Sequence, residues 1–155
     1  MIRGEGSAFI DGVTAQEVFD FVLDPAQYTK ADTKITGVTR LAETVDGMIA
    51  REDGLFLGVA PGSVITHYRW RAPTRIDVTL VSGAIRGMHA WFEIDEEAGG
   101  THVRHVEEVD FGWGPIGWLH DRLVQRWWQA SVAKEVSEIA RLLRAGERGK
   151  GIAAL

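Results

Sequence analysis

The sequence predicts an α+β fold in which a curved, seven-stranded antiparallel sheet wraps around one long C-terminal helix. Two observations support this prediction. Between Lys34 and Phe111 the chain holds short segments rich in Val, Ile, Thr and aromatic residues, separated by turn-forming pairs such as Asp-Gly and Gly-Gly. From Ile116 to Leu143 the apolar residues instead recur at helical spacing without a break. A sheet with one apolar face needs a cover, and this helix is long enough to supply it.

Composition narrows the class of protein. The 155 residues, 45% of them apolar and 25% charged, fit one globular domain, which we expect at residues 1–145 with a flexible tail at 146–155. The absence of cysteine excludes thiolate catalysis, cysteine-based zinc sites and disulfides. A net charge of -5 argues against a nucleic-acid partner. No stretch resembles a signal peptide or a membrane span, so the sequence predicts a cytoplasmic protein.

The N-terminal part predicts a strand, Arg3–Asp11, followed by two short helices. The first helix begins with a capping box, in which Thr14 accepts a hydrogen bond from the amide of Glu17 and the Glu17 carboxylate accepts one from the amide of Thr14. It ends at Asp24-Pro25, because the residue before a proline disfavours the α conformation. One or two further turns follow through Tyr28.

Six more strands follow, joined by connections so short that neighbours must be antiparallel. We expect them at Lys34–Glu43, Gly47–Leu57, Ser63–Arg71, Arg75–Val81, Ile85–Asp95 and Thr101–Phe111. The helix after them would span roughly 42 Å.

That long helix carries two apolar stripes. The first is Leu119, Leu123, Trp127 and Ala130, and the second is Val124, Trp128, Val132, Val136, Ile139 and Leu143. One stripe must pack on the sheet. The other can line a cavity, contact the helix pair or join two subunits in a homodimer, unless both stripes are core.

Strand alternation predicts an apolar wall facing the helix, because residues i and i+2 of a strand share a face. Such a wall with a few polar groups is typical of a small-molecule cavity, although the same side chains could simply fill a core. The predicted ligand-binding residues are Thr66, Tyr68, Trp70, Val78, Met88, Phe92, Val103, His105, Glu107, Leu119, Leu123 and Trp127. We expect no cofactor.

His105 and Glu107 are the candidate catalytic residues, since they share the drier face of the last strand, about 7 Å apart. A histidine and a carboxylate in an apolar cavity can act as general acid and base, because burial and mutual charge bring their pKa values toward the working pH. The alternative is a hydrogen-bonded pair that only stabilises the sheet. His102 and His105 point to opposite faces, so we expect no metal site.

The order of elements, together with several local motifs, resembles the START-like (SRPBCC) superfamily, whose fold is called the helix grip. The motifs are Val13–Phe19 followed by Asp24-Pro25, the strand Gly87–Ile94, the turn Gly99–Val103 and Gly114-Pro115 before the last helix. The superfamily includes polyketide cyclases/dehydrases, lipid-transfer domains and the birch pollen allergen group. The resemblance covers nearly the whole chain and implies a fold rather than one activity.

The resemblance and the apolar wall together predict a protein that binds a small hydrophobic molecule, such as a lipid, a polyketide or another aromatic metabolite. Two alternatives stay open. One is a polyketide cyclase or aromatase in which His105 and Glu107 move protons while Tyr68 and Thr66 orient the substrate by hydrogen bonds. The other is an interaction protein with a vestigial cavity, whose helix stripe binds a partner.

Overall fold

Seven antiparallel strands form one sheet in the computed structural model, which describes residues 1–56, 60–112 and 117–153 and, for Phe56, 117–121 and 147–153, the backbone only. The strands are β1 (Ile2–Asp11), β2 (Ile35–Thr44), β3 (Gly47–Phe56), β4 (Ala60–Arg71), β5 (Arg75–Gly83), β6 (Gly87–Glu97) and β7 (Gly100–Asp110). The helices are α1 (Ala15–Leu23), α2 (Pro25–Ala31) and α3 (Gly117–Ala153). The strand order is β1-β7-β6-β5-β4-β3-β2, so the first and last strands of the chain are neighbours.

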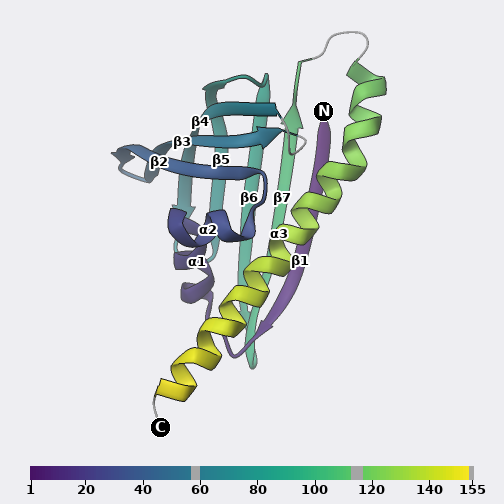
Figure 1. Cartoon of the computed structure of the whole chain (residues 1–155). Helices are drawn as coiled ribbons and strands as arrows, with labels where there is room; N and C mark the ends of the chain where they lie inside the picture. Colours follow the sequence, from purple (N-terminus) through teal and green to yellow (C-terminus); the bar gives the residue numbers. More distant parts are fainter. Residues whose placement is uncertain (57–59, 113–116, 154–155) are drawn as a thin grey trace.

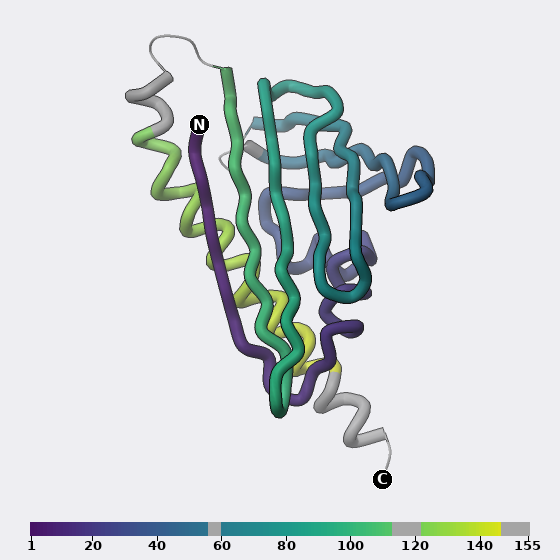
Figure 2. The backbone as a smooth tube through the Cα atoms, turned by 180° about the vertical axis from the view of Figure 1, so that it is seen from behind, coloured from purple at the N-terminus to yellow at the C-terminus, as the bar shows by residue number. Residues whose placement is uncertain are grey.

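The sheet curves around α3, and the predicted fold class is confirmed. In Figure 1, β2, β3 and β4 run across the view, whereas β1, β6 and β7 run along it, and α3 crosses in front of them. The view from behind in Figure 2 shows β1 and β7 side by side with α3 beyond them. The short helices α1 and α2 also pack on the concave face of the sheet, beside α3.

The capping box forms at the start of α1 as predicted. Thr14 Oγ1 accepts from the amide of Glu17 at 3.3 Å, and Glu17 Oε2 accepts from the amide of Thr14 at 3.0 Å. Asp24 ends this helix and caps the next one, because its carboxylate accepts from the amide of Ala26. The two helices therefore turn sharply at Asp24-Pro25.

Two glycines of β1 allow α3 to approach the sheet closely. A Cβ at Gly4 would lie 2.6 Å from Val132 Cγ2, and one at Gly6 would lie 2.9 Å from the Val132 carbonyl oxygen. Both distances are shorter than packed atoms tolerate. Glycine at these positions is therefore a condition of the helix packing.

Glutamines of α3 pair with the exposed backbone of β1, which is an edge strand. The side-chain amide of Gln125 accepts from the N–H of Arg3 and donates to its C=O. Gln129 makes the same pair of hydrogen bonds to Glu5. The helix thereby occupies edge groups that could otherwise pair with a strand of another chain.

The second apolar stripe of α3 is the one that packs on the sheet, and its members Val124, Trp128, Val132, Val136 and Ile139 are buried. Within the described residues, no helix combines the length and the apolar character needed to cross a membrane.

The long helix also extends further than predicted, because it continues past Leu143 to Ala153. No proline interrupts this segment, and each glycine costs only about 1 kcal/mol of helix propensity.

Candidate functional site

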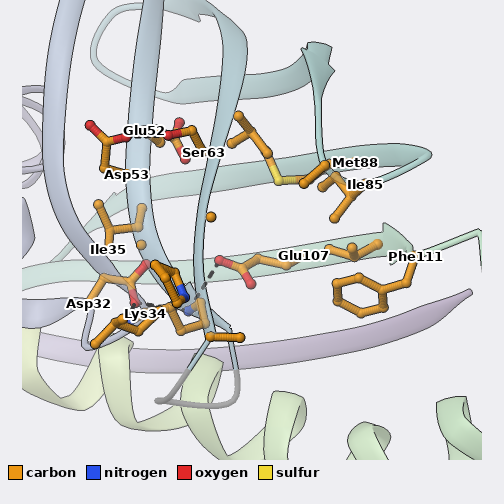
Figure 3. Close-up of a pocket in the computed structure, with 18 of the residues that line it drawn as sticks. Asp32, Lys34, Ile35, Glu52, Asp53, Ser63, Ile85, Met88, Glu107 and Phe111 are labelled. Carbon is orange, nitrogen blue, oxygen red and sulfur yellow. Dashed lines mark hydrogen bonds and ion pairs between the residues drawn. The ribbon is translucent and has the colours of Figure 1, made fainter.

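A cavity of about 310 Å³ lies between the sheet and α3. Its walls are largely apolar and include Ile85, Met88, Val109, Phe111, Trp127 and Trp128. Asp32, Lys34, Glu52 and Glu107 also line it, and we call this group the polar end. In Figure 3, Asp32, Lys34 and Glu107 lie on one side of the cavity, with Met88, Ile85 and Phe111 on the other.

Lys34 lies at the centre of the polar end. Its Nζ is 2.8 Å from Glu135 Oε2, 3.1 Å from Asp32 Oδ1 and 3.4 Å from Glu107 Oε1. Burial alone would lower the pKa of Lys34, but the charges of these three carboxylates outweigh it and hold the pKa well above its usual range. Lys34 is therefore a cation whose three N–H donors face three carboxylates.

His105 is buried behind the polar end. Its Nδ1 donates to the carbonyl of Trp91 at 3.0 Å, because a carbonyl oxygen can only accept. Its Nε2 lies 3.1 Å from Glu107 Oε1 and 3.4 Å from Glu135 Oε1. Burial would lower the pKa of His105, but Glu135 and Glu107 raise it above its ordinary value. The imidazole also stacks on Phe92, with ring centroids 3.8 Å apart, so it is fixed in place.

Two carboxylates of the polar end have opposite pKa shifts. Burial would raise the pKa of Glu107, but Lys34 and His105 hold it down at about 2. Burial and the charge of Glu135 raise the pKa of Asp32 to about 7, even though Lys34 opposes them. Near neutral pH Glu107 is therefore ionised, while Asp32 is present in both its protonated and its ionised form. Among the described residues, Asp32 Oδ2 and Glu107 Oε2 are buried without a hydrogen-bond partner.

Glu52 joins a second buried network. Its Oε1 accepts from the hydroxyls of Thr66 and Tyr68, both at 2.7 Å. Burial raises the pKa of Glu52, although these two hydrogen bonds oppose the shift. The hydroxyl of Tyr28 donates to Glu135, the carboxylate that contacts Lys34, at 2.6 Å. Hydroxyl groups thus hold two of the carboxylates in fixed positions.

Comparison with known proteins identifies the family. The family model for polyketide cyclase / dehydrase and lipid transport matches residues 1–144. The chain belongs to this family. No protein of curated function matches. The resemblance to the START-like superfamily, stated above from sequence motifs, is confirmed.

Solved structures show the same fold at low sequence identity. TTHA0849 from Thermus thermophilus has a TM-score of 0.80 and 14% identity, over 93% of this chain and 98% of that one. A START superfamily protein from Mycobacterium smegmatis has a TM-score of 0.71 and 20% identity, over 90% and 98%. Zhui aromatase/cyclase from Streptomyces sp. R1128 has a TM-score of 0.69 and 15% identity, over 93% and 96%.

The cavity of this family member includes only some of the residues predicted to bind a ligand, namely Met88, Glu107 and Trp127. The other predicted residues on the strands do not line the cavity, because their side chains pack in the core or hydrogen-bond within the buried polar networks. They are Thr66, Tyr68, Trp70, Val78, Phe92, Val103 and His105. Leu123, by contrast, is 72% exposed on α3. The Leu119 side chain, Leu57 and Gly114-Pro115 lie outside the described residues.

Sequence reasoning missed Asp32, Lys34, Glu52 and Glu135. The sequence contained a signal for Glu52 and Glu135, because each is a charged residue at a position where the apolar periodicity places a core-facing side chain. Glu52 follows Ala50 on the inward face of β3, and Glu135 lies among the buried residues of α3. No comparable pattern marks Asp32 and Lys34, because both lie in the short connection between α2 and β2.

His105, Glu107 and Glu135 could in principle hold a metal ion, since one ligand atom from each lies within 4.8 Å of the others. However, Lys34 Nζ already contacts Glu135 at 2.8 Å and Glu107 at 3.4 Å. A divalent cation among these three residues would have to displace this ammonium from Glu107 Oε1 and Glu135 Oε2. The cluster therefore suits Lys34 better than a metal ion.

Proposed function

We propose that this family member binds a small hydrophobic molecule in the cavity between the sheet and α3. The observation that carries the proposal is a cavity of about 310 Å³ with largely apolar walls and a few charged residues. Such a combination is typical of small-molecule sites, in which apolar contact supplies affinity and a few polar groups fix orientation. The family description, which includes lipid transport, supports the same role.

The apolar walls set the expected affinity. A ligand that buries about 400 Å² of apolar surface gains about 10 kcal/mol. The loss of translational and rotational freedom costs at least about 4 kcal/mol of this. The balance corresponds to a dissociation constant on the order of tens of micromolar.

Neighbouring residues of β4 provide the test. Val64 lines the cavity, whereas Ile65 faces the other side of the strand. Val64→Trp should fill the cavity and weaken binding of the neutral dye Nile red at least about tenfold, while Ile65→Trp should leave it unchanged. Fluorescence titration measures both, and native mass spectrometry of the purified protein can show a retained ligand. Equal affinity in the two variants would contradict the proposal.

A polyketide cyclase or aromatase activity is the second candidate, favoured by the contact between the buried His105 and Glu107, which lines the cavity. Asp32 is also suited to exchange protons near neutral pH, because its pKa is about 7. Asp32→Asn should then abolish conversion of a linear poly-β-ketone while Nile red still binds. Unchanged turnover in this variant would exclude Asp32 from the chemistry.

A cytoplasmic location and a homodimer are further parts of this proposal. Leu123 and Ala130 are exposed on α3, so these two members of the first stripe are available for a second copy. Leu123→Glu should convert a dimer into a monomer in light scattering, and a monomeric natural chain would contradict the homodimer.

A further inference from the structure

The charges at the polar end narrow the chemical class of ligand, and this inference rests on the proposed function. We propose that the cavity takes a hydrophobic amine, binds its ammonium group at the polar end and rejects carboxylates. Three features of the cluster support this: the hydrogen-bonding groups that remain free, the balance of charge and the aromatic surface beside it.

The free hydrogen-bonding groups are mainly acceptors when Asp32 is ionised. All three donors of Lys34 face carboxylates, and the hydroxyls of Thr66 and Tyr68 both donate to Glu52. Among the described residues, the buried groups without a partner are Asp32 Oδ2, Glu107 Oε2 and the indole N–H of Trp128. A buried acceptor without a donor costs free energy, and an ammonium group on the ligand would supply the missing donors.

The charge of the cluster is unbalanced in the same direction. Its carboxylates are Asp32, Glu52, Glu107 and Glu135, and its cations are Lys34 and, when protonated, His105. If all four carboxylates ionise, both cations together leave an excess of negative charge in a buried setting. Protonation of Asp32, whose pKa is raised to about 7, reduces this excess, which therefore grows as the pH rises above neutral. A ligand cation reduces this excess, whereas a ligand carboxylate increases it. The single neutral N–H of Trp128 cannot offset the charge of a carboxylate.

Aromatic rings next to the cluster can also face a cation. Lys34 Nζ already lies 5.6 Å from the ring centroid of Trp128. The Trp127 ring is 5.7 Å from the Trp128 ring, and both residues line the cavity. An ammonium near an indole face gains a cation–π interaction in addition to its ion pairs. The eight-carbon chain of a probe such as octylamine would then lie along the apolar walls.

Three probes with the same alkyl chain test the inference: octylamine, 1-octanol and octanoate, titrated by calorimetry into the natural protein near neutral pH. We expect octylamine to bind at least about tenfold more tightly than 1-octanol, and octanoate to bind more weakly than 1-octanol. If octanoate binds as tightly as octylamine, or if all three bind alike, the inference is wrong while the hydrophobic site stands. If none of the three binds and Nile red also fails to bind, the proposed function is wrong as well.

Two adjacent glutamates supply a matched pair of variants. Glu107→Gln removes a charge from the polar end, while Glu108→Gln removes one from the outer face of β7, where it pairs with Arg3 at 3.0 Å. Glu107→Gln should weaken the affinity for octylamine about tenfold and change the affinity for 1-octanol by less than about threefold. Glu108→Gln should change neither affinity. Retained binding of 1-octanol shows that the variant is folded. Equal octylamine affinity in the two variants would overturn the proposal.

Discussion

Asp32 makes the stability of this protein depend on pH in a direction opposite to that of most carboxylates. Burial and the charge of Glu135 raise its pKa from the ordinary value of 3.8 to about 7 in the folded protein. A carboxyl whose pKa is raised by folding stabilises the folded state while it is protonated. This contribution is complete below the pKa of the unfolded chain and is lost as the pH rises through about 7.

Asp32→Asn removes this titration with little change in shape. The introduced asparagine would keep an oxygen for the amide of Lys34, which now donates to Asp32 Oδ1 at 2.8 Å. A pKa that differs by one between the folded and unfolded states corresponds to about 1.4 kcal/mol. Between about pH 5 and pH 8 the natural protein should therefore lose about 2–3 kcal/mol relative to the variant. His105 titrates in both proteins, so its contribution largely cancels in the difference.

Urea unfolding of both proteins across this pH range measures the difference in the free energy of unfolding. Asp95→Asn, at an exposed position of β6, is the matched control. Carboxyl NMR of Asp32 reports its pKa directly. We expect the free energy of unfolding of Asp32→Asn minus that of the natural protein to increase with pH. If this difference stays constant or decreases as the pH rises, the assignment of a raised pKa to Asp32 is wrong.

Three other changes test the packing, each by urea unfolding. Thr14→Ala removes the cap of α1 and should cost about 1 kcal/mol, and an unchanged midpoint would contradict the capping role seen in the structure. Phe92→Ala empties a core position that is 2% exposed and should cost about 3–5 kcal/mol, so a loss below about 1 kcal/mol would mean that the site is not packed. Gly6→Ala places a methyl group against the backbone of α3 and should cost at least about 2 kcal/mol, whereas Gly37→Ala, with open space around it, should be nearly neutral.

The sequence was sufficient to predict the elements and the inward face of the sheet, because both follow from local periodicity. Strand alternation correctly placed Thr66, Tyr68 and Phe92 toward the core. The pairing of β1 with β7 could not be derived in this way. It depends on contacts between the two ends of the chain, such as the approach of α3 that Gly4 permits.

The site was less predictable, because periodicity cannot report which charged groups meet. Lys34 and Glu135 are 101 residues apart in the chain and lie 2.8 Å apart in the structure. A charged residue is rarely buried unless it is paired, so a single charge in the sequence is normally assigned to the surface. His105 and Glu107 were found because both lie on one strand, where alternation applies.

The polar end is better explained by a ligand than by the fold. Buried ion pairs seldom stabilise a protein as much as apolar side chains of the same size, because desolvation offsets their attraction. A cluster kept only for stability would also be expected to pair its polar atoms, yet one oxygen each of Asp32 and Glu107 has no partner among the described residues. Both residues line the cavity, and α3 supplies the buried Glu135 that holds Lys34 beside them. The arrangement keeps acceptors and negative charge at one end of an apolar cavity, which is where an amine would bind.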